Sequence, residues 1–110
     1  MWAYPEIRTL GQYPEYWARH DPERPALRTL TRTMSFAEFD RKANQVGNYL
    51  LKRISASGTL IGFLGRNSID FYLALFGTAK TRSGLVIYNW RLAAGELATQ
   101  VADSGARTVI

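Results

Sequence analysis

"TLIGFLGRNSIDFYLALFGTAKTRSGLVIY", residues 59–88, contains two short apolar runs, at 59–65 and 83–88, on either side of an apolar segment at 69–80. Short apolar runs bounded by turn residues are typical of strands buried on both faces. The middle segment is apolar nearly all round, which is typical of a helix enclosed in a larger body. The stretch therefore predicts strand, helix and strand in succession, the pattern of a βαβ unit.

The residues that follow continue this alternation. A helix is predicted over 94–102, with Ser104 and Gly105 as its end, and RTVI at 107–110 has the character of a further strand. The order predicts an α/β fold: the start of a doubly wound, largely parallel sheet with covering helices and right-handed connections. RTVI has the pattern of an interior strand, but no covering helix follows it in this sequence. Because a bare apolar sheet edge favours aggregation, we expect the front portion of a longer protein or a chain that needs a partner.

Ahead of the βαβ unit the sequence predicts a helix and a hairpin. Aromatic residues recur near one face of the segment 9–20, which ends at HDPERP and is predicted to be helical. Thr-rich alternation over 26–34 predicts a short N-terminal β-hairpin. Farther along the chain, SASG at 55–58 is expected to break the helix that follows the hairpin.

Two helix starts carry capping residues. Ser35 and Glu38 match the S-x-x-E capping box, in which each side chain binds the free backbone N–H of the other residue. The helix that this box opens is predicted to reach about Ile54, because apolar residues recur at three- and four-residue steps. Asn67 or Ser68 can cap the following helix.

Composition places the chain among ordered globular domains. A length of 110 residues is enough for one small domain with a modest core. The residues are 46% hydrophobic and 21% charged, which is ordinary for a globular protein. The sequence contains no cysteine, which excludes disulfides and zinc–cysteine sites. No run approaches the roughly 20 apolar residues that cross a bilayer, and the N-terminus lacks the pattern of a secretory signal. We therefore expect a cytoplasmic protein with no transmembrane segment.

The basic balance of charge does not by itself identify a partner. The formal net charge is +5, from 14 Lys and Arg against 9 Asp and Glu. These basic residues are scattered along the chain, and no nucleic-acid-binding motif is present. We interpret them as a solvated surface and predict no nucleic-acid partner; a basic nucleic-acid binder is the alternative that the charge alone suggests.

Few residues of this chain could carry out chemistry. His20, the single histidine, lies at a helix end beside Asp21 and is interpreted as a surface residue rather than a catalytic base. Lys80, near the end of the apolar helix, is interpreted as a cation at the negative helix terminus. GFLGRNS at 62–68 matches neither glycine-rich nucleotide-binding motif. The residues therefore predict no catalytic group and no metal ligand within the chain.

Five segments, taken in order, resemble the N-terminal region of the acyl-adenylate-forming enzymes, also called AMP-dependent synthetases and ligases. They are "YWARHDPERPAL", "MSFAEFDRKANQVGNYL", "LIGFLGRNSIDFYLALFGTAKT", "VIYNWRLAAGEL" and "VADSGARTVI". Each segment alone is a weak signal, but five in the family order with family-like spacing are specific. YNWRL and FYLALFGTAK are most similar to the fatty-acyl and aryl acyl-CoA ligases.

The resemblance implies both an activity and an incomplete enzyme. Family enzymes join a carboxylic acid to AMP with ATP and Mg²⁺, release pyrophosphate, and transfer the acyl group to a thiol, usually that of CoA. Residues 1–110 are thereby implied to be the N-terminal part of the large adenylate-forming domain, without its downstream subdomains and the C-terminal domain. The phosphate loop, the acyl pocket and the adenylation lysine lie downstream in the family. The chain alone is thus expected to bind no cofactor and to be inactive.

One ligand-binding residue is implied within the chain. In some CoA ligases of the family, the arginine of an N-P-R-L turn contacts the phosphates of the CoA nucleotide, and the matching residue here is Arg91. A guanidinium suits this role because it binds phosphate bidentately and stays charged. The structural alternative is that Arg91 pairs with Glu96 or a downstream carboxylate. Asn89 is expected to hydrogen-bond the turn backbone, and Trp90 to cover the sheet edge.

Three positions depart from the family pattern. Arg82 stands where relatives usually have glycine, Ile87 where they often have proline, and Thr59 where an acidic residue is common. Arginine is favourable at a helix C-terminus but lacks the left-handed backbone freedom of glycine. We expect these changes to affect local turn geometry rather than the fold.

Other interpretations of the sequence stay open. A peptide-synthetase adenylation domain is the nearest alternative within the superfamily. From a different class, the chain could be a non-catalytic α/β interaction module or a truncated gene product. The aromatic residues near the N-terminus could serve a homodimer contact, although packing within the chain is their commoner use. They are Trp2, Tyr4, Tyr13, Tyr16 and Trp17.

Overall fold

Helices and strands alternate along the chain in the computed structural model, which describes residues 4–54 and 58–110. In chain order the elements are α1 (Gln12–His20), β1 (Pro25–Arg28), β2 (Thr33–Ser35), α2 (Phe36–Leu51), β3 (Leu60–Leu64), α3 (Ile69–Lys80), β4 (Gly84–Tyr88), α4 (Ala94–Ser104) and β5 (Thr108–Val109). No helix in the described part of the chain is long and apolar enough to span a membrane.

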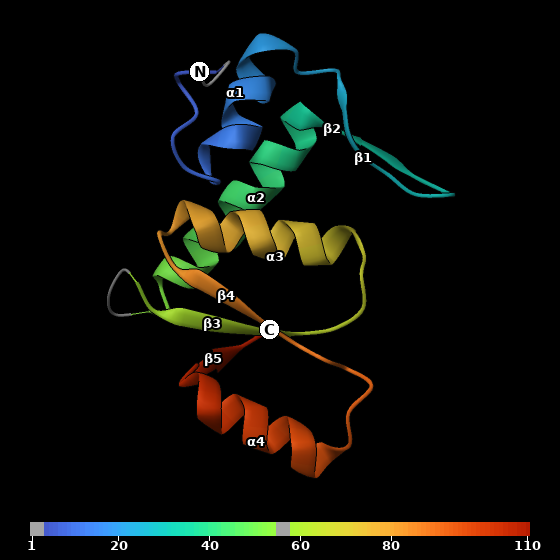
Figure 1. Ribbon diagram of the computed structural model, residues 1–110. Helices are drawn as coiled ribbons and strands as arrows, with labels where there is room; N and C mark the ends of the chain where they lie inside the picture. The colour runs from blue at the N-terminus through green and yellow to red at the C-terminus, as the bar shows by residue number, and fades with distance from the viewer. Residues whose placement is uncertain (1–3, 55–57) are drawn as a thin grey trace.

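The predicted parallel sheet is confirmed. Its strand order is β4-β3-β5, and β3 pairs with β4 in parallel register from Leu60↔Gly84 to Leu64↔Tyr88. On its other side β3 pairs in parallel with β5. Helices α3 and α4 cover opposite faces of the sheet (Figure 1). β3, the first strand of this sheet along the chain, lies at its centre, and helices cover both of its faces. This arrangement defines the start of a doubly wound α/β fold.

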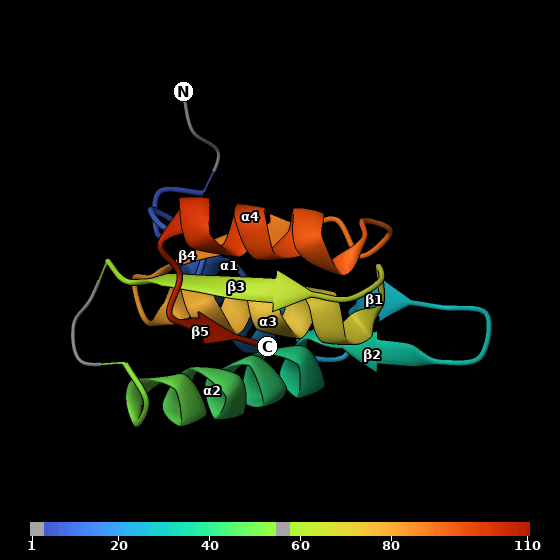
Figure 2. The same ribbon diagram turned by 90° about the horizontal axis from the view of Figure 1, so that it is seen from below.

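RTVI forms the short strand β5, but within the described residues this strand lies at the edge of the sheet. It pairs with β3 through Ile61↔Thr108 and Gly62↔Val109. Figure 2 shows β3 and β5 pointing in the same direction. Val109 is 45% exposed. The strand prediction is therefore confirmed, and an interior position of this strand in a longer sheet stays a prediction.

The N-terminal elements form a second layer on α3. Strands β1 and β2 pair antiparallel, as the Thr-rich alternation predicts, and the hairpin projects from the body in both views (Figures 1 and 2). Figure 1 places α1 and the hairpin beyond α3, on the side away from α4. The core of this layer consists of the buried side chains of Met34, Phe36 and Phe39, with Phe76 of α3 packed against them.

The N-terminal aromatic residues pack on one another. The ring of Tyr4 lies 5.5 Å from that of Tyr16 and 5.8 Å from that of Trp17, both in edge-on geometry. The rings of Tyr16 and Trp17 are 5.2 Å apart. Trp2 lies outside the described residues. These contacts use the rings within the chain, while a homodimer contact stays a prediction.

Helices α2 and α3 meet closely at Gly77. A Cβ atom on Gly77 would lie 2.5 Å from Val46 Cγ1 and 3.1 Å from the carbonyl oxygen of Ala43. A side chain therefore does not fit at this crossing unless α2 moves away. Near the same contact, Lys80 Nζ lies 2.7 Å from Asp40 Oδ1, and both side chains are largely buried.

Helix α1 begins three residues later than predicted, at Gln12 rather than Thr9. The reason is Pro14. A helix that began at Thr9 would require the Pro14 nitrogen, which carries no hydrogen, to donate to the carbonyl oxygen of Leu10. The observed start places Pro14 in the first turn, where the backbone N–H groups have no intrahelical partner.

The capping box at the start of α2 is only half formed. Ser35 Oγ accepts from the Glu38 N–H at 3.2 Å, as predicted. The Glu38 carboxylate, however, accepts from Arg32 Nη2 at 2.8 Å instead of from Ser35, because the hairpin brings this guanidinium within reach. Helix α2 ends at Leu51 rather than near Ile54, although the Ile54 N–H still donates to the Leu50 carbonyl at 2.9 Å. The predicted break SASG lies, for residues 55–57, outside the described part of the chain.

The later helix ends follow the sequence more closely. Of the two candidate caps for α3, the structure uses Ser68, whose Oγ accepts from the Phe71 N–H at 3.3 Å. Gly105 ends α4 as predicted, with a left-handed φ of 74°, and the helix itself reaches Ser104, two residues beyond the predicted 102. Glycine adopts this conformation without steric cost, which is why it commonly follows a helix.

Helix α3 ends in a Schellman motif that places Arg82 in the left-handed region. The Arg82 N–H donates to the Ala79 carbonyl at 3.0 Å, and the Ser83 N–H donates to the Thr78 carbonyl at 3.3 Å. Arg82 has a φ of 60°. The resemblance leads us to expect glycine at this position, and only glycine adopts this φ without the steric cost of a Cβ.

The crossing at Gly77 predicts a pair of opposite stability effects. Gly77→Ala should lower the free energy of unfolding by about 1–3 kcal/mol because its Cβ overlaps Val46. Gly95→Ala is the matched control in α4, where a Cβ would meet no heavy atom within 4 Å. Because Gly95 lies in the first turn of the helix, this control should raise the stability only slightly, by up to about 0.5 kcal/mol. Urea denaturation measures both changes, and equal stabilisation by the two variants would contradict the close crossing.

The backbone at Arg82 predicts a stabilising substitution. Arg82→Gly should raise the free energy of unfolding by roughly 0.5–1 kcal/mol, since the relief of left-handed strain exceeds the added entropy of the unfolded chain. Arg82→Ala keeps a Cβ and should give no such gain. The two unfolding curves distinguish backbone strain from loss of the arginine charge, because a gain in both variants would implicate the charge.

Candidate functional site

The turn that follows β4 is held by the side chain of Asn89. Its Oδ1 accepts from the Arg91 backbone N–H at 3.0 Å, and the Leu92 N–H donates to the Asn89 carbonyl at 3.1 Å. An asparagine that binds the backbone two residues ahead mimics a backbone turn. These two hydrogen bonds set the direction in which Trp90 and Arg91 leave the end of the strand.

Tyr88 anchors the strand immediately before this turn. Its ring is buried and lies against Gly62 on β3, where an added Cβ would be 2.5 Å from the ring. The Tyr88 hydroxyl lies 2.7 Å from Ser104 Oγ at the end of α4. The turn therefore starts from a strand end that is fixed to both the neighbouring strand and the covering helix.

Trp90 brings two guanidinium groups together at the carboxyl edge of the sheet. Arg66 Cζ lies 4.4 Å from the centre of a Trp90 ring, and Arg91 Cζ lies 5.1 Å from it. Arg66 comes from the loop between β3 and α3, two residues after Leu64. Because Leu64 is in register with Tyr88, the residues two positions beyond each strand end lie at the same level. Cation–π attraction suits both contacts.

Neither of these arginines has a carboxylate partner in the described part of the chain. The ion pairs found there are Arg19–Glu15, Arg32–Glu38 and Lys80–Asp40. A pair between Arg91 and Glu96, the structural alternative that the sequence leaves open, is not among them. Two exposed guanidinium groups without a counter-charge favour an anionic ligand, and open α/β sheets bind ligands outside the carboxyl ends of their strands.

The other sequence candidates lie elsewhere. His20, at the end of α1, stacks on Tyr16 with ring centres 4.2 Å apart. Lys80, in the last turn of α3, binds Asp40 of α2 across the helix crossing. Among residues 4–54 and 58–110, no group of three His, Asp or Glu side chains could hold a metal ion.

Arg66 is the member of this edge that sequence reasoning missed. It lies in GFLGRNS, which matches no phosphate-loop motif and so did not suggest a ligand contact. The signal that points to Arg66 is its place two residues after Leu64, the end of β3, just as Trp90 lies two residues after Tyr88, the end of β4. That signal becomes useful only when the register of β3 and β4 is known, because a shift of one residue would separate the two side chains.

The fold and this edge define a doubly wound α/β domain with a candidate anion site at the carboxyl ends of its strands. The chain belongs to the AMP-binding enzyme family, whose model matches residues 14–110. The curated fatty acid–[acyl-carrier-protein] ligase ScoC of Streptomyces coeruleorubidus is 36% identical over 104 residues, which cover 94% of this chain and 20% of that protein. A feruloyl-CoA synthase of an Amycolatopsis species is 31% identical over 101 residues, which cover 92% of this chain and 21% of that protein.

Solved structures agree with this assignment. The Mycobacterium tuberculosis fatty acyl CoA synthetase superposes with a TM-score of 0.86 at 28% identity, covering 92% of this chain and 20% of that chain. The present chain thus spans about a fifth of the length of these ligases. The predicted family membership and α/β fold are confirmed.

Proposed function

We propose that residues 1–110 form the N-terminal part of the large domain of an ATP-dependent acid–thiol ligase. The ligase would join a carboxylic acid, fatty or aryl, to the α-phosphate of ATP with Mg²⁺, giving acyl-AMP and pyrophosphate. It would then transfer the acyl group to the thiol of CoA and release AMP. Membership of the AMP-binding enzyme family supports this proposal, as does the likeness to a fatty acyl CoA synthetase.

Arg91 is the residue of this chain that we assign to the second step. Its guanidinium is exposed, lacks a carboxylate partner in the described residues and lies beside the Trp90 ring, on a turn held by Asn89. A guanidinium in this state can bind a phosphate of the CoA nucleotide with two parallel hydrogen bonds. The unpaired charge at the fixed turn is the observation that carries the assignment.

A carrier protein is the second candidate acceptor. The relative of 36% identity is named a fatty acid–[acyl-carrier-protein] ligase. Such an enzyme delivers the acyl group to a thiol on a carrier protein rather than to free CoA. The two acceptors differ in the product, since acyl-CoA forms in one case and an acylated carrier in the other.

The Arg91 assignment predicts a selective effect on the full-length ligase. Arg91→Ala should raise the apparent KM for CoA by roughly 10- to 100-fold, since it removes charge-assisted hydrogen bonds. ATP–pyrophosphate exchange, which reports adenylate formation alone, should be unchanged. Arg28→Ala, which removes an exposed cation from the hairpin, is the matched control and should alter neither measurement.

Each other outcome has a definite meaning. An unchanged KM for CoA in Arg91→Ala would reject the phosphate contact while leaving the ligase activity in place. Acylation of a holo-carrier protein without formation of acyl-CoA would select the second acceptor.

The isolated chain should not catalyse the first step. ATP–pyrophosphate exchange by the purified 110-residue chain should remain at background, because the family's phosphate loop and adenylation lysine lie downstream of the matched region. The exchange is measured with the acid substrate present and absent. Acid-dependent exchange above background by this chain alone would overturn this expectation.

A further inference from the structure

Trp90 stands at the proline position of the N-P-R-L turn to which this segment is similar, and two guanidinium groups contact its side chain. Arg66 Cζ lies 4.4 Å and Arg91 Cζ 5.1 Å from a Trp90 ring centre. Trp90 is 40% exposed, so solvent and ligands can reach this contact. A proline would offer no aromatic face to a cation. The contact between Arg66 and position 90 is therefore a feature that this sequence adds to the turn.

The two guanidinium groups come from different loops at one end of the sheet. Arg66 follows β3 and Arg91 follows β4, and Figure 1 shows both loops leaving the same end of the sheet, one toward α3 and the other toward α4. The strands are paired in parallel as far as Leu64↔Tyr88. The sheet itself thus sets how far apart the two loops begin, and the tertiary structure brings the two cations to one ring.

These two positive charges are close together and uncompensated. Both side chains are exposed, and the ion pairs of residues 4–54 and 58–110 include neither of them. Like charges that share one ring repel each other, and over so short a distance dissolved salt screens this repulsion only in part. A ligand with more than one negative charge would offset the repulsion and be attracted by each group.

A cation–π contact restrains a guanidinium without using its hydrogen-bond donors. The face of the indole attracts the positive charge, whereas the five N–H groups of arginine lie along the edge of the guanidinium plane. Trp90 thereby limits the motion of both side chains, so that a ligand loses less of its binding free energy to the ordering of flexible groups. Both groups remain able to bind a phosphate with parallel hydrogen bonds.

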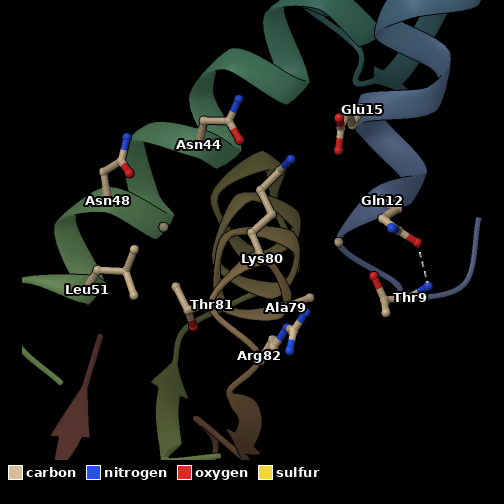
Figure 3. Close-up of a pocket in the computed structure, with 12 residues that line it drawn as sticks. Thr9, Gln12, Glu15, Asn44, Asn48, Leu51, Ala79, Lys80, Thr81 and Arg82 are labelled. Carbon is tan, nitrogen blue, oxygen red and sulfur yellow. Dashed lines mark hydrogen bonds between the residues drawn. The ribbon is translucent and has the colours of Figure 1, made fainter. Parts of the chain in front are cut away.

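The polar pocket between α1, α2 and α3 offers no comparable arrangement (Figure 3). Its volume is about 370 Å³, and Lys80 stands between Asn44 and Arg82. The charge of Lys80 is already compensated by Asp40. The polar groups of the pocket thus lie on separate walls, whereas the two guanidinium groups at Trp90 share one contact.

We propose that Arg66 is a second phosphate-binding residue of the acceptor site, held near Arg91 by the ring of Trp90. The ligand class is a thiol acceptor that carries more than one phosphate group, as CoA does with its diphosphate and its 3′-phosphate. The prosthetic group of a carrier protein has a single phosphodiester and offers less charge to the pair. This inference rests on the proposed function, because it concerns the acceptor of the second step.

Kinetics of the full-length ligase with two acceptor thiols test the role of Arg66. The acceptors are CoA and pantetheine, which has the thiol of CoA but no phosphate. Arg66→Met keeps an extended side chain against Trp90 but removes the charge, and it should raise the apparent KM for CoA by about tenfold or more. The kcat/KM for pantetheine and the rate of ATP–pyrophosphate exchange should be unchanged, because neither measurement involves a phosphate of the acceptor.

Arg107→Met is the matched control. It removes one exposed positive charge just before β5, at the amino end of the parallel strands, and should leave the KM for CoA unchanged. An unchanged KM for CoA in Arg66→Met, or an equal loss with CoA and with pantetheine, would overturn the role of Arg66 and leave the ligase function in place. Formation of acyl-AMP without acyl-CoA by the unchanged ligase would reject CoA as the acceptor, and the role of Arg66 with it.

Discussion

Gly77 brings the backbones of α2 and α3 together, and the two layers of the molecule are joined at this crossing. The absent side chain lets Val46 and the Ala43 carbonyl occupy the space of a Cβ. The ion pair between Lys80 and Asp40 lies at the same contact and is largely removed from solvent. Because α3 also covers the sheet, this one crossing sets the position of the N-terminal layer relative to the βαβ unit.

Three consecutive residues at the C-terminal end of α3 each serve a different purpose. Lys80 binds α2, Thr81 caps the helix, and Arg82 turns the chain so that β4 can begin at Gly84. The turn is tight because both bonds of the Schellman motif form. Arginine forms this turn at the cost of a left-handed φ, and it brings a positive charge that glycine would not.

Local patterns were sufficient to predict most of the elements. The apolar runs at β3 and β4, the apolar helix between them and the glycine after α4 all fall within a few residues of their predicted places. The errors had two causes, one of them a second element that competes for a group and the other a proline inside the predicted helix. Glu38 binds Arg32 of the hairpin instead of Ser35, and α1 is shortened because Pro14 cannot donate. The Arg32–Glu38 contact depends on a distance that no local pattern contains, whereas the effect of Pro14 is local and could have been predicted from the sequence.

The candidate site divides in the same way. Asn89, Trp90 and Arg91 are consecutive, so chain order alone places them in one turn, and the alternation of apolar segments is enough to predict the α/β fold. The contact of Arg66 with Trp90 arises from packing, because the parallel register of β3 and β4 sets two separate loops at one level.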